Sequence, residues 1–349
     1  MTKRLEKFKN YMKHRLIYLS EDESILNSKN DIEKDKCFIN TTNKSNIKLF
    51  TEKNKLSIDD YIDYGATSKI FKIKYSIKKN RNYKNFYFAM KVMSLNKIEI
   101  EIMKKSTINV ISNNTPHFVI LYSNYLCNEN DNTIFDDINF IDNSIESDTS
   151  RKDLLINQLK GINSFLTDKK YSLLIMELFD GNLVSLLFND LQRLSDETKK
   201  WIHSQIYISI LSFHKLIDTY IHNDVQYKNF FYKKIECSDN EYFYYKIFNI
   251  DIYIKNIGYL IILGDYGLSE KNFDNEKSVL EDYRYISYNY EINSKIEEYI
   301  SSKKRKIEGN IEENFFKEIF IENKLKLFLQ QEDLPSNYKL LNEKVYIIN

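Results

Sequence analysis

The stretch IHNDVQYKNF, Ile221 to Phe230, places an acid and an amide at a spacing suited to chemistry. Asp224 and Asn229 stand five residues apart, and His222 precedes the acid by two residues. A carboxylate can hold a hydroxyl group and take its proton, while an amide oxygen can bind a metal ion. An ordinary polar loop at the end of a helix has the same composition. The loop alone therefore leaves both interpretations open.

Charged residues in or beside other apolar segments support the interpretation of the loop as a reaction centre. Lys91 lies within FAMKV, an apolar strand-like run where a lysine is costly unless its ammonium reaches a partner or an opening. Glu99 and Glu101 of EIEIM are both candidates for that partner. Asp265 follows the apolar run YLIILG and offers a second oxygen ligand, as Mg²⁺ prefers few protein ligands.

Apolar patterning predicts the elements that position these residues. Runs rich in β-branched and aromatic residues predict an antiparallel sheet, followed by a helix largely buried in a core and then an enlarged β-hairpin that ends at Asp265. The C-terminal part is helical in character. The predicted strands are 64–75, 85–93, 117–126 and 171–179, the buried helix is 199–217, the hairpin is 230–265 and the C-terminal helical part is 293–331.

Three other segments have a choice of interpretations. Residues 1–19 carry apolar side chains at helical spacing, which fits a helix packed on the domain or a helix that binds a partner. The segment 127–170 begins rich in Asp and Asn, and it fits a solvated insertion better than a metal site because its acids lack regular spacing. KKRK at 303–306 fits a solvated helix face or a nuclear address.

Composition limits the classes of function. With 51 basic and 50 acidic residues, the formal charge of +1 predicts neither nucleic acid nor a membrane surface as the main partner. Three cysteines without a C-x-x-C pair favour a reducing intracellular setting, and no signal-peptide core or bilayer-length apolar segment is evident. Seven glycines and two prolines, beside abundant Lys, Asn, Ile and Tyr, suggest an A/T-rich genome.

In order and spacing, the segments from about Tyr64 to Gly267 resemble the protein-kinase fold. With this composition, the chain is similar to the divergent serine/threonine protein kinases of nucleocytoplasmic large DNA viruses. The resemblance implies an α+β, two-lobe fold with a small antiparallel-sheet N-lobe and a mainly helical, reduced C-lobe that has an enlarged β-hairpin before DYG. The implied division is an N-terminal extension with an amphipathic helix (1–45), an N-lobe with a polar insertion at 127–170 (46–178) and a C-lobe (179–349).

The resemblance implies a site for ATP. It makes Lys91 the contact to the α- and β-phosphates, and EIEIM matches the family pattern when Glu99 is the glutamate that holds it. Only eight residues separate the two, so the helix with the glutamate must start late or be short. The other implied ATP contacts are Gly65 at the phosphates, Ile70 as a lid over adenine, Met176 at the back of the pocket and the backbone of Glu177 to Phe179.

The resemblance also assigns the chemical step. Asp224 orients the substrate hydroxyl and takes its proton late, while Asn229 and Asp265 bind Mg²⁺. His222 then fits a structural hydrogen-bonding role better than an acid or base role.

Several positions depart from the family pattern. Asn223 replaces the usual loop arginine, so regulation by activation-loop phosphorylation is not expected. Gln226 replaces a lysine that contacts phosphate, and Lys228 is the expected substitute. A-P-E is absent from the sequence after Asp265, and EDYRYISYNYEINSKI only faintly echoes that segment.

The sequence thus predicts an ATP- and Mg²⁺-dependent kinase that phosphorylates a protein hydroxyl, on serine or threonine. One alternative is a pseudokinase that serves as an ATP-binding scaffold, and another is a kinase-fold phosphotransferase for small molecules. The expected partner is a protein substrate, with no nucleic acid and no membrane insertion, and the sequence indicates no oligomeric state. The expected location is the cytoplasm of a host cell or a virion.

Overall fold

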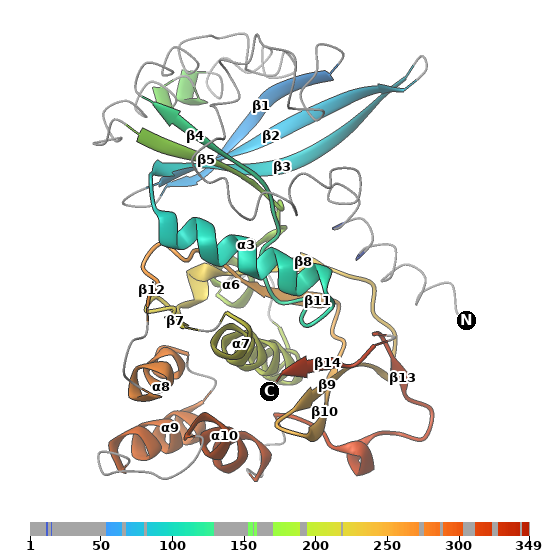
Figure 1. The fold of residues 1–349 in the computed structure, drawn as a ribbon. Coiled ribbons are helices and arrows are strands. Elements are labelled where there is room, and N and C mark those ends of the chain that lie inside the picture. The colour runs from blue at the N-terminus through green and yellow to red at the C-terminus, as the bar shows by residue number, and fades with distance from the viewer. Residues whose placement is uncertain are drawn as a thin grey trace. The chain divides into compact units, whose positions relative to one another are not determined.

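The chain has a mixed α+β fold in a computed structural model (Figure 1). It divides into two compact units. The sheet unit comprises His14–Ile100 and Ile120–Leu178, and the helical unit comprises Met1–Lys13, Glu101–Val119 and Phe179–Asn349. The structure describes residues 12, 15, 54–64, 68–79, 82–128, 153–155, 157–158, 170–188, 194–217, 219–271, 276–286, 289–302, 311–322, 327–342 and 344–348.

The sheet unit is built on five antiparallel strands in the order β1-β2-β3-β5-β4. The predicted antiparallel sheet is therefore confirmed. Sequence patterning missed β1, because two register shifts interrupt its pairing with β2 and break the alternation of apolar residues. The strands are β1 (Asn54–Tyr64), β2 (Ser68–Lys79), β3 (Asn82–Ser94), β4 (Leu121–Asn128) and β5 (Lys170–Met176).

Helix α3 (Lys97–Ile111) follows β3 after a two-residue connection, Leu95 and Asn96. The Asn96 side chain accepts a hydrogen bond from the Glu99 N–H at 3.1 Å, which satisfies one of the unpaired amides of the first turn. The helix has 15 residues, so of the two alternatives it starts late and is not short.

The centre of the helical unit is α7 (Asp196–Leu216), which confirms the predicted buried helix. The Ser195 hydroxyl caps it by accepting from the Thr198 N–H at 3.1 Å. Gln205 of α7 donates to the Tyr259 carbonyl and accepts from the Ile261 N–H, both at 3.0 Å. These bonds satisfy part of the edge of a strand that the helix covers.

The predicted hairpin ending at Asp265 is confirmed and is elaborated. Strands β8 (Phe230–Lys234) and β11 (Tyr259–Leu263) pair with each other, and β9 (Glu241–Ile247) and β10 (Ile250–Lys255) form a hairpin between them in sequence. Short pairings extend these sheets. Those elements are β6 (Gly181–Asn182) on β8, β7 (Tyr220–Ile221) with β12 (Glu270–Lys271), and β13 (Lys339–Leu340) and β14 (Tyr346–Ile348) on β9.

The predicted helical character of 293–331 is confirmed for the described residues 293–302 and 311–321, which are α- or π-helical, while 327–330 are not helical. Beyond this range the chain returns to β9 as two short strands. A run of two or three strand residues carries no readable periodicity. The remaining elements are α6 (Leu183–Leu187), α8 (Glu276–Arg284), α9 (Tyr290–Ser302), α10 (Ile311–Phe316), the π turn Lys317–Ile321 and the 3-10 turns Tyr227–Asn229 and Gln331–Asp333.

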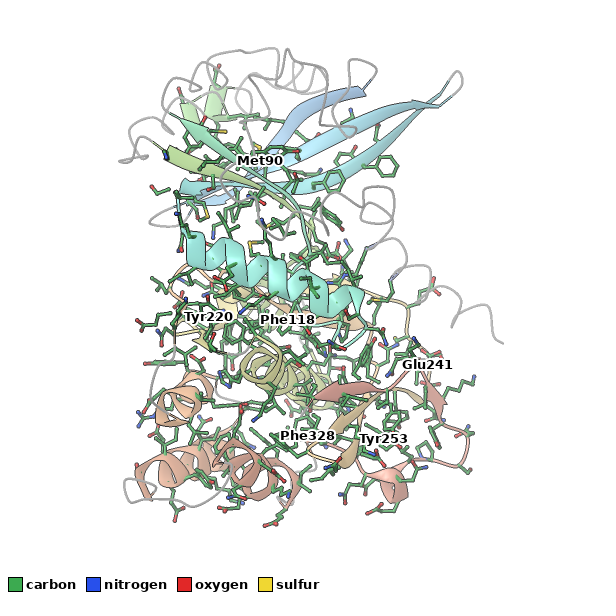
Figure 2. All side chains as sticks on the ribbon, in the orientation of Figure 1. Met90, Phe118, Tyr220, Glu241, Tyr253 and Phe328 are labelled. Atoms are coloured by element: carbon green, nitrogen blue, oxygen red, sulfur yellow. The ribbon has the colours of Figure 1, made fainter. Side chains whose placement is uncertain are left out.

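The stretch Glu101–Val119 belongs to the helical unit, whereas the predicted division placed it with the sheet. Its polar side chains bond within the helical unit. The Asn109 amide donates to the Leu216 carbonyl at 3.1 Å, and the buried His117 ring contacts the Ile261 carbonyl at 2.6 Å and the Tyr245 hydroxyl at 2.7 Å. Phe118 and Phe328 are among the buried aromatic residues of this unit (Figure 2).

Two findings bear on the expected setting. Among the helices that the structure describes, none is long and apolar enough to cross a membrane. Cys127, buried on β4, is disulfide-bonded, while Cys237 is exposed and free. The disulfide does not fit the reducing compartment that the cysteine spacing suggested.

We expect Tyr245→Phe to lower the free energy of unfolding by about 1–3 kcal/mol, because it removes the hydroxyl group that donates a hydrogen bond to a buried ring nitrogen of His117. Tyr244→Phe is the matched control, since its hydroxyl bonds to Asp251 near the surface, and it should cost under about 0.5 kcal/mol. Urea unfolding measures both. Equal losses in the two variants would contradict the role given to His117.

Candidate functional site

The loop between β7 and β8 fixes the amide of Asn229 against Asp224. Asn229 is 2% exposed and lies in the 3-10 turn Tyr227–Asn229. Its side-chain nitrogen donates to the Asp224 carbonyl oxygen at 2.7 Å and to the Asp224 carboxylate at 2.8 Å. Because the nitrogen is used in this way, the side-chain oxygen is the atom of this amide suited to a metal ion.

The Asp224 carboxylate accepts hydrogen bonds at both oxygens. Oδ2 accepts from Asn229, and Oδ1 accepts from the side-chain nitrogen of Gln226. Both donors are neutral amides, so the carboxylate is oriented by hydrogen bonds that bring no positive charge. Lys228 is exposed in the same turn, as a substitute phosphate contact needs to be.

Backbone pairing brings the Asn229 loop against the segment with Asp265. Phe230 and Leu263 are partners in the β8–β11 ladder, and the Gly264 N–H donates to the Asn229 carbonyl at 3.0 Å. A Cβ at Gly264 would lie 2.6 Å from Val119 Cγ2 and 2.9 Å from Phe231 Cε2. Glycine is required here because the neighbouring side chains leave no room for a Cβ.

Asp265 is exposed and has a φ of 55°, in the left-handed region where non-glycine residues are uncommon. The next residue anchors this conformation. Tyr266 is fully buried, stacks on Phe213 with ring centroids 5.7 Å apart, and donates its hydroxyl to the Leu263 carbonyl at 2.8 Å. Backbone strain held by packing in this way is typical of functional positions.

His222 has a structural position. Its Nε2 donates to the Gly264 carbonyl at 3.2 Å, and its Nδ1 accepts from the Asp224 N–H at 3.3 Å. Burial lowers the pKa of His222, in spite of nearby carboxylates that act in the opposite direction. The neutral ring thus ties the backbone of Asp224 to that of Gly264, which fits the hydrogen-bonding role and not an acid or base role.

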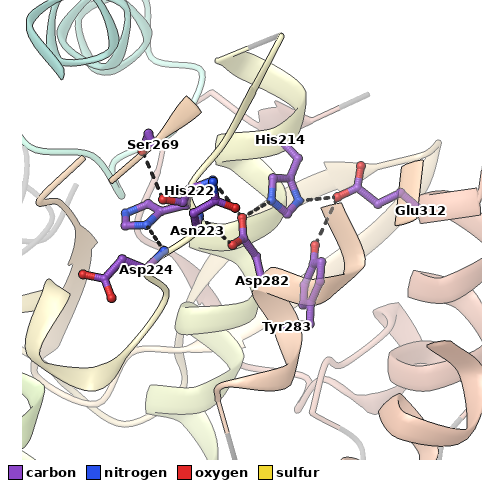
Figure 3. Close-up of polar contacts among 8 residues, drawn as sticks. All are labelled: His214, His222, Asn223, Asp224, Ser269, Asp282, Tyr283 and Glu312. Atoms are coloured by element: carbon purple, nitrogen blue, oxygen red, sulfur yellow. Dashed lines mark hydrogen bonds and ion pairs between the residues drawn. The ribbon is translucent and has the colours of Figure 1, made fainter. Parts of the chain in front are cut away.

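A buried carboxylate holds the chain just before Asp224. Asp282, on α8, accepts the His222 N–H at 2.9 Å and the Asn223 N–H at 3.0 Å (Figure 3). Asn223 itself has a φ of 60°, so these bonds support another left-handed residue. Sequence analysis did not identify Asp282, although it lies within the EDYRYISY segment that had been compared with A-P-E.

The charge of Asp282 is balanced by His214, on α7. The His214 ring contacts Asp282 through Nε2 and Glu312 through Nδ1, both at 2.9 Å (Figure 3). Burial by itself lowers the pKa of His214, but the two carboxylates outweigh it and raise the pKa to about 9. Burial opposes ionisation of the Asp282 carboxyl, but the His214 hydrogen bond and charge lower its pKa.

Asn223 occupies the position of the expected loop arginine. Its side-chain nitrogen donates to the Glu270 carboxylate on β12, and β12 in turn pairs with β7. The chain after Asp265 is therefore held beside the loop by a neutral amide and two backbone pairs. A hydrogen bond of this kind needs no phosphorylated residue to form.

In the sheet unit, Lys91 and Glu99 form the ion pair that the match of EIEIM to the kinase pattern implied, in spite of their short spacing. The Lys91 Nζ lies 2.6 Å from Glu99 Oε1, and the side chains are 6% and 3% exposed. Glu101, the other candidate, instead pairs with Lys105 at 3.4 Å. Ile70 lies directly opposite Lys91 in the β2–β3 register and is half-buried.

The end of β5 carries the residues predicted to contact adenine. Met176 is half-buried and pairs with Ala89 on β3. The Glu177 N–H donates to the Ile120 carbonyl at 3.1 Å, so this amide is used within the sheet unit. Phe179 belongs to the helical unit and stacks on Phe231 with ring centroids 5.0 Å apart.

A second buried ion pair lies at Glu177. Arg15 donates to Glu177 Oε2 from Nε at 3.1 Å and from Nη2 at 2.9 Å, and the two side chains are 1% and 7% exposed. Met12 and Arg15 are both helical, as predicted for 1–19. Arg15 lies three residues after the apolar Met12, a spacing that places both on one helix face. That spacing could have indicated that Arg15 lies on the buried face of the predicted helix.

Some predicted features lie outside the described residues. These include Gly65, the KKRK stretch and most of the polar insertion at 127–170. Within the part of the chain that the structure describes, no group of three or more His, Cys, Asp or Glu side chains is arranged to hold a metal ion. The predicted metal ligands form a smaller set of one amide and one carboxylate.

Comparison with protein-family models finds no match to the chain. No curated protein sequence is significantly similar to it.

We expect Arg15→Met to lower the stability of the sheet unit by about 3–5 kcal/mol, because it breaks a buried ion pair by removing the guanidinium charge beside the Glu177 carboxylate. The double variant Arg15→Met/Glu177→Met removes both charges and should recover most of the loss. The exposed pair Lys233–Asp180 is the control, and Lys233→Met should cost at most about 1 kcal/mol. Thermal unfolding measures all three, and a double variant no more stable than Arg15→Met would refute the explanation.

Proposed function

We propose that the protein is an ATP- and Mg²⁺-dependent protein kinase that phosphorylates serine or threonine. One observation carries the proposal: the backbone of Asn229 is bonded to Gly264, beside Asp265, while the Asn229 amide nitrogen orients Asp224. A proton-accepting carboxylate is thereby fixed in one loop with an amide oxygen, and a second carboxylate follows the strand paired to it. This is the ligand chemistry that phosphoryl transfer to an alcohol needs.

The reaction assigned to this site is a displacement at phosphorus. The substrate hydroxyl oxygen bonds to the γ-phosphorus of ATP, the bond from that phosphorus to the β–γ bridging oxygen breaks, and ADP leaves. Asp224 holds the hydroxyl and accepts its proton late in the step. Asn229 and Asp265 would hold Mg²⁺, which supplies neutralisation of the phosphate charge when bound.

The sheet unit supports the proposal with the Lys91–Glu99 pair. A lysine ammonium held at 2.6 Å by a glutamate is fixed in direction, which suits it to bind phosphate oxygens. The proposal assigns this ammonium to the α- and β-phosphates of ATP. Ile70, across the ladder from Lys91, is assigned to the adenine, with Met176 at the back of the pocket and backbone groups of Glu177 to Phe179 beside it.

The finer features of fold, origin and setting belong to the same proposal. A five-stranded antiparallel sheet with a helix after its third strand supports the N-lobe of a protein-kinase-like fold. Relationship to the kinases of large DNA viruses is supported by composition and by the stretch TPHFV at 115–119. A protein substrate and activity in host cytoplasm or in a virion are what that relationship implies, and of the two settings the Cys127 disulfide favours the virion.

Gln226 favours a second candidate, an ATP-binding scaffold without transfer activity. Its amide donates to Asp224 Oδ1, one of the oxygens that would receive a substrate hydroxyl. A hydroxyl must share or displace this donor before it reaches the carboxylate. A scaffold retains ATP binding in the sheet unit without needing that exchange.

A transfer assay separates the candidates. With labelled ATP and Mg²⁺, we expect the protein to label itself or casein, and we expect Asp224→Asn to reduce the rate by about 10²- to 10⁴-fold through loss of the proton acceptor. Lys91→Met should also abolish labelling. If the wild-type protein labels nothing but Mg·ATP raises its melting temperature, the scaffold is favoured. Label on sugars or aminoglycosides alone would indicate a small-molecule phosphotransferase.

Lys228 is the residue of the loop assigned to supply the charge that Gln226 lacks. We expect Lys228→Ala to lower kcat by about 10²-fold with little change in the KM for ATP, because the contact is made to the transferring phosphate. Lys234→Ala, an exposed lysine on β8, is the matched control and should leave kcat unchanged. Equal rates for the two variants would exclude this role of Lys228.

A further inference from the structure

The buried charges next to the loop extend to the C-terminal helix α10. Glu312 of α10 accepts hydrogen bonds from His214 Nδ1 at 2.9 Å and the Tyr283 hydroxyl at 3.2 Å (Figure 3). It also pairs with Lys215 Nζ at 3.2 Å. The His214, Asp282 and Glu312 side chains are 2%, 3% and 9% exposed. Water therefore screens these charges little.

The geometry fixes the protonation of His214. Both ring nitrogens lie 2.9 Å from carboxylate oxygens, and an ionised carboxylate only accepts hydrogen bonds. A neutral imidazole has one N–H and can satisfy one of these acceptors. The ring must therefore be an imidazolium that donates to Asp282 from Nε2 and to Glu312 from Nδ1.

This imidazolium makes Asp282 an effective acceptor for the loop. Asp282 receives the backbone N–H groups of His222 and Asn223, and a buried carboxylate stays ionised only while a positive charge compensates it. His214 can remain charged in a buried position because Glu312 faces its other nitrogen. The charge at Glu312 thus acts on the loop through two intervening side chains.

We propose that Glu312 is a positioning residue for Asp224, acting through His214 and Asp282 on the loop backbone. The inference rests on the proposed function for its link to catalysis. Its structural claim is that Glu312 strengthens the hydrogen bonds that Asp282 accepts from the backbone amides of His222 and Asn223. The titratable groups against His214 are Asp282 and Tyr283 on α8 and Glu312 on α10. Beyond them, Lys215 on α7 pairs with Glu312, and His222 beside β7 acts on Asp282.

The test compares Glu312→Gln with Glu313→Gln in the full-length protein. Both remove one negative charge from α10, but Glu313 pairs with Lys317 on the following turn. The amide introduced by Glu312→Gln would still accept from His214 Nδ1 but would supply no charge. The pKa of His214, raised to about 9 in the wild-type protein, should then fall toward or below its ordinary value of 6.5.

The sign of the pH effect follows from this shift. A raised pKa means that the stabilisation by protonated His214 is complete below pH 6.5 and is lost as pH rises through about 9. In Glu312→Gln the loss should begin at lower pH. We expect kcat near the wild-type value in mildly acidic buffer and reduced by about tenfold or more at pH 8, with an unchanged KM for ATP.

Hydrogen exchange provides a readout that does not need activity. The amides of His222 and Asn223 should exchange about tenfold faster in Glu312→Gln than in Glu313→Gln at pH 8. If no phosphate transfer is found in the wild-type protein, the proposed function fails and this measurement still decides the inference. Equal exchange in the two variants, or parallel pH profiles of kcat, would overturn it.

A measurement on the wild-type protein applies if Glu312→Gln does not fold. Imidazole NMR signals of His214 report its titration, and protection of the His222 and Asn223 amides should fall over the same pH range. Protection that persists after His214 loses its proton would overturn the inference.

Discussion

The loop geometry depends on the bonds that the buried Asp282 carboxylate receives. Two of the bonds come from successive peptide N–H groups, and the third comes from a charged imidazole. A buried carboxylate without such partners would be strongly destabilising. Because Asn223 lies at a bend and has a left-handed φ, its conformation needs support from outside the loop. The bonds to Asp282 supply this support directly before Asp224, and the His222 ring ties the Asp224 backbone to Gly264.

The sheet unit and the helical unit differ in how they hold their candidate functional groups. In the sheet unit, Lys91 and Glu99 compensate each other's charge. In the helical unit, the Asp224 carboxylate is held by the neutral amides of Gln226 and Asn229. Neutral donors orient a carboxylate without adding charge next to the position assigned to phosphate. In the helical unit the positive charge lies instead on the buried His214 ring, where it compensates Asp282.

Sequence reasoning succeeded where a local pattern carries the information. The EIEIM motif pointed to Glu99 as the partner of Lys91, and the apolar run before Asp265 predicted a strand paired with the one after Asn229. It failed where the partner of a buried charge is set by tertiary packing. Asp282, Glu312 and Arg15 lie in segments whose periodicity gives no sign of the residues they meet. Strand β1 was hidden by its bulges, and β13 and β14 are too short to show alternation.

Because glycine is scarce, most of the described residues in the left-handed region are other amino acids, and this affects the free energy of folding. Of the seven described non-glycine residues with positive φ, five are Asn or Asp, including Asn223 and Asp265. Asparagine and aspartate tolerate this region better than other side chains because they bond locally to the backbone. A glycine would fit the same conformation but would lose more freedom on folding. With these residues the unfolded chain has less backbone entropy than with glycine, and this difference offsets part of the strain in the turns and favours the folded state.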